Sequence, residues 1–315
     1  MSCRSGHGRR VGCLVVADIA VDDVLIRELL REQHPELAGL ELREVVGGWD
    51  NQMWRLGDEL AVRIPRTPRA PELLRIELEW LPSLAERLPL PTPVPLRAGE
   101  PSTLFPKPWH VVRWVPGEPA DRIPISHPDS TVTLAGFLKA LHVEAPVDAP
   151  VNPQRSVPLK DLVGHFEDWF GYTAMGSGGG VGAEVRRVLE AAFAAPAWDG
   201  PPVWLHADLH PANVLVEDGG LSGVIDFGDM CAGDPATDLS AAWILLPAGA
   251  AGQFFEAYGG VDDPMRERAL GWAAYRAFGL MAIGKAGEEG RPGGKKTWGP
   301  AGRSALERVL AQAAH

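Results

Sequence analysis

Three polar side chains in the second half of the chain have the types and the spacing that phosphoryl transfer requires. Asp208 is followed five residues later by Asn213, and a second carboxylate, Asp226, lies on the next predicted hairpin. Phosphoryl transfer depends on positioning, on a divalent cation and on a group that orients the attacking hydroxyl. We therefore predict that Asp208 accepts or orients the hydroxyl proton. Asn213 and Asp226 are predicted to bind Mg²⁺ through hard oxygen ligands.

The same segment allows a different kind of metal site. His206, Asp208 and His210 alternate, so an extended strand would place all three side chains on one side, as a zinc site requires. Residues 205–213 have the composition of a turn, however, and the sequence offers no evident fourth ligand. The phosphoryl-transfer interpretation is therefore favoured over zinc binding.

The segment 205–213 and the tripeptide 226–228, Asp-Phe-Gly, resemble the catalytic loop and the metal-binding element of the protein-kinase superfamily. They resemble the aminoglycoside phosphotransferase family of antibiotic and metabolite kinases more closely. Ala207 stands where this family usually has Gly, a change that we expect to matter little, and His210 stands where protein kinases often have Lys. A further family motif occurs at 233–239, and the resemblance implies that its Asp238 braces the catalytic loop.

A basic residue in the first half of the chain is assigned to the nucleotide. Residues 60–63, Leu-Ala-Val-Arg, stand where protein kinases have Val-Ala-Ile-Lys, whose Lys binds the α- and β-phosphates. Strand alternation puts Ala61 and Arg63 on one face. The resemblance, which at 63–66 extends to macrolide kinases, implies that Ala61 packs on the base while Arg63 reaches the phosphates with its fork of N–H donors. The alternative is an exposed arginine at the end of a strand.

The resemblance also assigns a carboxylate to pair with this cation. Glu77 in the predicted helix 72–86 is the first choice, because its relation to Trp80 matches the family. Glu79 is the reserve choice, although it should lie roughly 200° around the helix from Glu77.

Two backbone segments complete the expected nucleotide site. Residues 111–117, which include Val112 and Trp114, resemble the hinge between the two lobes, whose N–H and C=O groups would hold the purine edge. Trp114 is equally consistent with an ordinary core residue. The pair Gly47-Gly48 lies where a loop would cover the phosphates.

The predicted elements place these residues in two lobes of an α+β, protein-kinase-like fold. Hydrophobic periodicity and turn residues indicate an N-terminal antiparallel sheet lobe, then a mostly helical C-terminal lobe. We expect an N-terminal extension (1–20), a nucleotide-binding lobe (21–116) and a catalytic, acceptor-binding lobe (117–315). The first lobe has predicted strands at 41–46, 52–56, 60–64 and 110–115, helices at 22–32 and 72–86, and a proline-rich extended stretch at 89–108. The second has predicted helices at 130–142, 159–170, 183–193, 235–246, 252–258, 264–284 and 304–314, short strands at 203–205, 214–216 and 223–225, glycine-rich 176–180 and a mobile loop at 287–302.

Composition excludes several classes of protein. The formal net charge of −11 argues against nucleic acid as a partner and suits a cationic ligand. No apolar run approaches the roughly 20 residues of a membrane-spanning helix. The first 20 residues resemble a signal peptide only superficially, because acidic residues interrupt the apolar stretch. The three cysteines, at positions 3, 13 and 231, form no disulfide or zinc pattern, so a reducing cytoplasmic location is expected.

Together these features predict an enzyme that moves the γ-phosphate of ATP or GTP to a hydroxyl of a small molecule, with Mg²⁺ as cofactor. By resemblance the acceptor is an antibiotic, an aminoglycoside before a macrolide, and it is cationic. The alternatives are a metabolite kinase for choline, homoserine or a ketoamine, and a catalytically silent nucleotide-binding protein. A protein kinase is disfavoured, because no Ala-Pro-Glu motif follows Asp226. A monomer or a homodimer is expected.

Overall fold

The computed structural model describes residues 20–45, 47–173 and 180–314. Its first half contains a five-stranded antiparallel sheet with the strand order β1-β2-β3-β5-β4. The strands are β1 (Leu42–Val45), β2 (Asn51–Leu56), β3 (Leu60–Pro65), β4 (Pro95–Gly99) and β5 (Trp109–Arg113). β3 is central, and its register with β5 pairs Ala61 with Val112 and Arg63 with His110.

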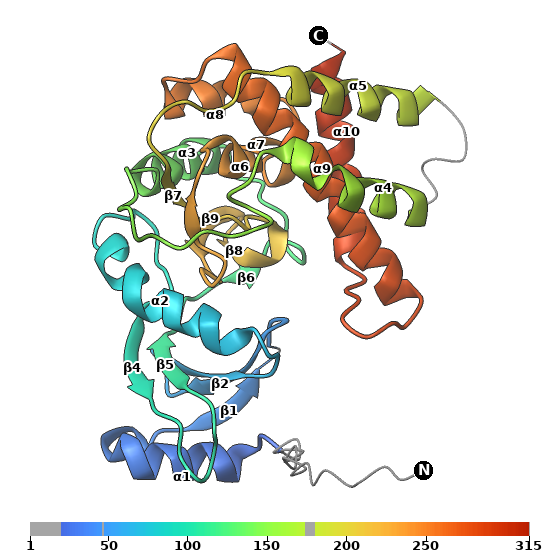
Figure 1. Cartoon of the computed structure of the whole chain (residues 1–315). Coiled ribbons are helices and arrows are strands. Elements are labelled where there is room, and N and C mark those ends of the chain that lie inside the picture. The colour runs from blue at the N-terminus through green and yellow to red at the C-terminus, as the bar shows by residue number, and fades with distance from the viewer. Residues whose placement is uncertain (1–19, 46, 174–179, 315) are drawn as a thin grey trace, which may run out of the picture.

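One face of the sheet is covered by α1 (Asp23–Gln33), which runs along the outer end of the molecule (Figure 1). The carboxylate of Asp22 caps this helix by accepting from the N–H of Leu25 at 2.9 Å. Its apolar stripe packs on apolar side chains of the sheet, and the shared core includes Ile26, Leu29, Leu30, Trp54, Leu56, Val62 and Ile64. The period of about 3.6 in the helix and of 2 in the strands produces this match.

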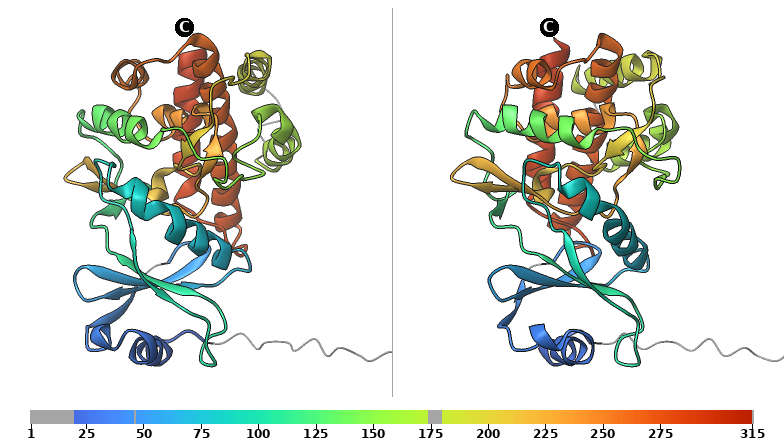
Figure 2. Two further views of the ribbon diagram at one scale, coloured as in Figure 1. Left: turned by 60° about the vertical axis from the view of Figure 1, so that its left-hand side comes forward. Right: turned by 90° about the vertical axis from the view of Figure 1, so that its left-hand side faces the viewer.

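The second helix, α2 (Ala70–Ala85), connects the sheet with the rest of the molecule. Ile76, Leu81 and Leu84 belong to the large core of the C-terminal half rather than to the core beneath α1. Figure 2 shows α2 lying between the sheet and the helices of the C-terminal half. Residues of α2 are therefore held against the segments that follow β9.

The C-terminal half is built around α9 (Asp263–Glu288), whose middle is buried on every side. Asp262 caps it by accepting from the N–H of Met265 at 2.8 Å. Around it lie α3 (Ser130–Leu141), α4 (Val163–Tyr172), α5 (Gly180–Ala194), α6 (Ala236–Leu239), α7 (Ala241–Ile244), α8 (Ala251–Tyr258) and α10 (Trp298–Ala313). A helix without one polar face belongs in the interior, and here it forms the spine of the core.

Short strands carry the polar loops at the boundary between the two halves. β6 (Glu118–Pro119), β8 (Val214–Glu217) and β9 (Gly220–Val224) form one sheet, and β7 (Val203–Leu205) pairs with β10 (Cys231–Gly233). The segment between β7 and β8 and the segment between β9 and β10 therefore connect the same two sheets, because β7 pairs with β10 and β8 pairs with β9. Among the described helices, none is long and apolar enough to cross a membrane.

Most predicted elements are present, with three differences. The proline-rich stretch contains the strand β4 at the sheet edge, where proline is tolerated. The helix predicted at 235–246 breaks at Ser240, whose hydroxyl donates to the carbonyl of Thr237 at 2.6 Å. The loop predicted at 287–302 is shorter, because α9 continues to Glu288 and α10 begins at Trp298. Positions 1–19 and 174–179, which we predicted to be an extension and a flexible segment, lie outside the described residues.

Candidate active site

A buried carboxylate shapes the loop that carries Asp208. Asp238, at the end of α6, accepts the backbone N–H of His206 at 2.6 Å and that of Ala207 at 2.9 Å. Asp238 has no exposed surface. Burial alone would raise its pKa, but the hydrogen bond from His142 and nearby positive charge outweigh burial and lower the pKa. An ionised Asp238 therefore holds the start of the loop, as the family resemblance implied.

The loop turns within three residues, and this turn excludes the zinc arrangement. His206 uses Nδ1 to accept the N–H of Asp208 at 3.2 Å, and its Nε2 lies 3.0 Å from the carbonyl of Ile225. His210 uses Nδ1 to accept the N–H of Ala212 at 3.2 Å. No group of three His, Cys, Asp or Glu side chains is arranged to hold a metal ion in the part of the chain that the structure describes. The strand-like alternation considered for 206–210 does not form.

The turn also gives a reason for the glycine that the family usually has at position 207. Ala207 has a φ of 68°, in the left-handed region, and it is fully buried. This conformation costs an L-residue roughly 1–2 kcal/mol and costs glycine little. The replacement of Gly by Ala, which we expected to matter little, therefore carries a backbone cost.

Four side chains surround the carboxylate of Asp208. Arg155 and Arg276 approach Oδ1 at 2.9 Å and 3.3 Å. His210 Nε2 and Asn213 Nδ2 each lie 3.4 Å from Oδ2. Burial would raise the pKa of Asp208, but the charges of Arg155, His210 and Arg276 hold it well below its usual range. The carboxylate is therefore ionised at neutral pH.

The predicted metal ligands lie next to this carboxylate. The amide nitrogen of Asn213 donates to the carbonyl oxygen of Asp208 at 3.0 Å, which leaves the amide oxygen for a cation. Asp226 is 42% exposed and lies 3.6 Å from Arg63. Loss of hydration beside the surrounding protein raises the pKa of Asp226 although its side chain is partly exposed, while Arg63 opposes the shift. A carboxylate and an amide oxygen are hard oxygen ligands of the kind that Mg²⁺ prefers. The guanidinium of Arg63 lies near the carboxylate and offsets part of its charge.

Two glycines allow the backbone to approach Asp226. A Cβ on Gly48 would lie 4.0 Å from Asp226 Oδ2, so the loop between β1 and β2 passes over this carboxylate. A Cβ on Gly228 would lie 2.9 Å from the Cβ of Leu73, so the Asp-Phe-Gly segment packs tightly under α2. The structure thus places the predicted phosphate loop over the predicted metal site.

Arg63 is buried, and it pairs with Glu77. Burial raises the pKa of Glu77 to about 7, and the neighbouring Arg63 opposes this shift. The reserve candidate, Glu79, is 47% exposed and pairs instead with Arg75 on the surface. The structure therefore joins Arg63 to Glu77 and not to Glu79. The contact between Arg63 and Asp226 brings this pair to the edge of the predicted metal site.

The predicted purine-binding residues are only partly available. Ala61 and Val112 are buried partners across β3 and β5. The N–H of Trp114 donates to the carbonyl of Glu59 at 2.7 Å, and the guanidinium of Arg55 lies 4.6 Å from the centre of its ring. The N–H of Trp114 is therefore used within the sheet lobe, and purine binding by the other backbone groups of 111–117 stays a prediction.

Sequence analysis missed the two arginines on Asp208 and a bridge between the halves. Arg276 is a lone charge in the apolar middle of α9, a signal that marks a buried ion pair. Arg155 lies in a loop with no such signal. Arg69 reaches Asp50 at 2.7 Å and Asp229 at 3.2 Å, and so links the β1–β2 loop to the segment after Asp226.

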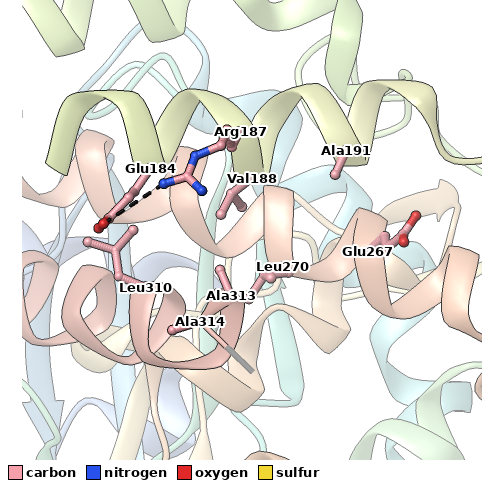
Figure 3. A pocket seen from close by; sticks show the side chains of 9 residues that line it. All are labelled: Glu184, Arg187, Val188, Ala191, Glu267, Leu270, Leu310, Ala313 and Ala314. Carbon is pink, nitrogen blue, oxygen red and sulfur yellow. Dashed lines mark ion pairs between the residues drawn. The ribbon is translucent and has the colours of Figure 1, made fainter. Parts of the chain in front are cut away.

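A separate pocket lies between α5, α9 and α10 (Figure 3). Its polar side chains are Glu184, Arg187 and Glu267, and the rest of its lining is apolar. None of the residues that contact Asp208 lines this pocket. We therefore place the reactive site at Asp208 and not in this pocket.

Known proteins resemble this chain both in sequence and in fold. Residues 41–278 match the model of a phosphotransferase enzyme family, APH. Two homoserine kinases are similar in sequence: one from Acidiphilium cryptum, 31% identical over 188 residues (54% of this chain, 55% of that protein), and one from Gluconobacter oxydans, 32% identical over 173 residues (52% and 53%). The chain spans about half the length of these curated relatives.

Solved structures show the fold. The GDP complex of wild-type aminoglycoside 2'-phosphotransferase-IIIa superposes with a TM-score of 0.66 at 19% identity, covering 93% of this chain and 99% of that one. A macrolide 2'-phosphotransferase from Brachybacterium faecium superposes with a TM-score of 0.56 at 21% identity, covering 88% and 97%. These likenesses confirm the predicted α+β, kinase-like fold. With the family model matching most of its length, the chain belongs to the phosphotransferase enzyme family.

Proposed function

We propose that this protein is an NTP-dependent O-phosphotransferase that uses Mg²⁺ and phosphorylates a hydroxyl of a small molecule. One observation carries the proposal: an ionised Asp208 on a tightly braced turn lies beside Asn213, and the Arg63–Glu77 pair reaches Asp226 from the sheet. This arrangement supplies an acceptor-orienting carboxylate, hard oxygen ligands and a buried cation for the phosphates. A catalytically silent protein has no need to keep all of them.

In the proposed reaction, the acceptor hydroxyl donates a hydrogen bond to Asp208. A bond forms between the hydroxyl oxygen and the γ-phosphorus, and the bond from that phosphorus to the bridging oxygen of the β-phosphate breaks. The proton passes to Asp208. Because the pKa of Asp208 is low, this carboxylate is a weak base and acts mainly by orienting the hydroxyl. A loose phosphoryl transition state requires no early proton removal. Bound Mg²⁺ would neutralise phosphate charge, with Asn213 and Asp226 as its ligands.

The sequence predicted a cationic aminoglycoside as the acceptor, and two facts support that proposal. The net charge of −11 favours cationic ligands, and several structurally similar proteins are aminoglycoside phosphotransferases. Three carboxylates that follow the catalytic hairpin already have partners: Asp234 pairs with Arg268 at 2.7 Å, Asp262 caps α9, and Asp229 pairs with Arg69. The proposal of a cationic acceptor therefore rests on the net negative charge of the whole molecule and not on a local cluster of carboxylates.

A small hydroxylated amino acid is the second candidate acceptor. The observation that favours it is the pair of guanidinium groups at Asp208, a setting that suits an anionic group on the acceptor. The sequence similarity to two homoserine kinases supports the same class. The macrolide, choline and ketoamine alternatives have no corresponding feature among the contacts of Asp208.

The variant Asp208→Asn tests the proposed reaction. We expect kcat to fall by about 10²–10⁴-fold, because a positioned proton acceptor typically contributes that much. MgATP or MgGTP affinity should remain, since Arg63, Glu77 and Asp226 hold the nucleotide. Turnover is measured by NDP release over a panel of aminoglycosides, macrolides, hydroxy amino acids and simple alcohols, and affinity by calorimetry.

The matched control is Asp129→Asn, which removes an 86% exposed carboxylate before α3 and should leave turnover unchanged. Wild-type turnover in a folded Asp208→Asn protein would show that the reaction occurs elsewhere.

A further inference from the structure

The carboxylate of Asp208 is shared by two arginines, one buried and one partly exposed. Both Arg155 and Arg276 approach the same oxygen, Oδ1, and Arg276 also donates to the carbonyl of Ala207. Among the described residues, Asp208 is the ion-pair partner recorded for either guanidinium. The next carboxylate, Asp238, is already held by two backbone N–H groups and His142. Two guanidinium groups therefore converge on one oxygen of Asp208, and the ionised Asp238 also lies close to Arg276.

Sharing one carboxylate oxygen leaves hydrogen-bond donors of the two arginines without partners. Arg276 is 7% exposed, and its burial and its repulsion by Arg155 lower its pKa, while the charges of Asp208 and Asp238 oppose the shift. The Nε–H groups of both arginines are buried without a hydrogen-bond partner in the part of the chain described. Unpaired buried donors carry a free-energy penalty, and an anion held by Arg155 would add a hydrogen-bond acceptor to this cluster.

The two arginines differ in how a ligand can reach them. The side chain of Arg155 is 18% exposed, whereas that of Arg276 is 6% exposed and packs beside the ring of Trp272. Arg155 comes from the segment before α4, and Asn152 in that segment donates to Asp229 at 3.0 Å. Arg155 is therefore fixed at the rim of the site, and Arg276 supports it from α9.

The position of the pair points to the acceptor more than to the nucleotide. Asn213, which we assign to the metal, lies at Oδ2 of Asp208, while both arginines lie at Oδ1. The Arg63–Glu77 pair and Asp226 supply the charged groups assigned to the nucleotide. An acceptor that donates its hydroxyl to Asp208 can thus place a second group against Arg155.

We infer that Arg155, supported by Arg276, forms an anion subsite. This subsite selects acceptors that carry a carboxylate on the same short carbon chain as the reactive hydroxyl. The inference rests on the proposed phosphotransfer and specifies its substrate class. A guanidinium fork matches the two oxygens of a carboxylate, which a lysine or an amide cannot reproduce. The subsite explains why two cations converge on one catalytic carboxylate.

The test compares acceptors that differ only in this group. Hydroxy acids and hydroxy amino acids of two to six carbons, L-homoserine among them, are each paired with the corresponding amide, and kanamycin is included as a polycation. Binding is measured by calorimetry with MgADP present, and turnover by NDP release. We expect at least one acid to bind about 10–100-fold more tightly than its amide, the loss expected for a hydrogen bond to a charged group.

Variants then assign the discrimination to Arg155. Arg155→Gln should reduce the preference for the acid over its amide to within about threefold, and Arg155→Lys should restore part of it, since a lysine keeps the charge without the fork. The control Arg97→Gln removes a 52% exposed arginine on the sheet and should keep the full preference.

Two outcomes overturn the inference, and a third separates it from the proposed reaction. If no acid binds more tightly than its amide, or if kanamycin is the best acceptor, the subsite does not select a carboxylate, although phosphotransfer stands. If Arg155→Gln raises the KM for the nucleotide and leaves the acid preference intact, the pair serves the transferred phosphate instead. An acid preference in binding without any NDP release would support the subsite while rejecting the proposed reaction.

Discussion

At the scale of single residues, the site depends on how buried charges are paired. Arg63 and Glu77 are buried together, and Glu77 would be expensive to leave without its cation. The lysine usual in protein kinases is a point charge, whereas arginine can pair with one carboxylate and still present N–H groups to another partner. In this structure Arg63 faces both Glu77 and Asp226.

The variant Arg63→Lys should therefore keep the positive charge and lose the contact with Asp226. We expect the KM for MgATP or MgGTP to rise by about 10-fold, the cost of one charged hydrogen bond of roughly 1.5 kcal/mol. Arg63→Ala should be worse, because Glu77 is left buried without a partner, a change that costs about 3–5 kcal/mol of stability. Steady-state kinetics and thermal unfolding measure the two effects.

Arg66→Lys, on the exposed residue after β3, is the control and should match the wild type. If Arg63→Lys also matches it, the prediction that Arg63 holds phosphate is wrong.

At the scale of elements, a short helix and a loop are fixed to each other by one carboxylate. Asp238 of α6 reaches two successive N–H groups of the loop after β7, at the point where Ala207 adopts its left-handed conformation. These bonds offset the backbone cost at Ala207 and fix the turn that carries Asp208. The brace thus couples the packing of α6 to the geometry of the reaction.

We expect Asp238→Asn to damage both stability and turnover. An amide has only one acceptor oxygen, so one of the two N–H groups would face an NH₂ group. The free energy of unfolding should fall by about 3 kcal/mol, and kcat by about 10–100-fold, because a small displacement of Asp208 is enough for a loss of that size. Denaturant unfolding and NDP release measure these changes.

The control is Asp234→Asn, whose carboxylate is 24% exposed and pairs with Arg268. Its cost should be about 1 kcal/mol or less, with kcat preserved. Equal effects of both variants on kcat would remove the special role of Asp238.

At the scale of the whole molecule, the two halves meet at the nucleotide-binding groups. α2 shares its apolar side chains with the C-terminal core, and Arg69 links Asp50 beside the phosphate loop to Asp229. A nucleotide bound to Arg63 and Asp226 would contact both halves. Its binding should therefore stabilise the molecule as a unit.

MgATP or MgGTP at 100 times its Kd should raise the free energy of unfolding by about 2.7 kcal/mol. Asp226→Ala should abolish the Mg²⁺-dependent part of this stabilisation, since no neutral side chain replaces a metal carboxylate. Thermal unfolding with nucleotide, with and without EDTA, makes the measurement. Asp129→Ala is the control, because its carboxylate is 86% exposed. A persistent Mg²⁺ effect in Asp226→Ala would place the metal on other ligands.

The sequence by itself determined the family and the order of most elements, and it predicted residues for the transfer step. Short-range signals carry this information: spacing within 205–228 singled out Asp208, Asn213 and Asp226 as candidates, and hydrophobic periodicity identified the sheet and the long helices. The strand alternation that suggested zinc does not form, because the backbone N–H groups of His206 and Ala207 donate to Asp238 where the chain turns at Ala207.

Only the tertiary structure decided which charges meet. Arg155 and Arg276 lie 53 and 68 residues from Asp208 along the chain, and periodicity carries no information over that separation. The same holds for the choice of Glu77 over Glu79, which depends on the face that α2 turns toward β3. Long-range pairing is set by how α9 and the loop before α4 pack around the catalytic turn. The physical reason is that burial, not spacing, makes a charge select its partner.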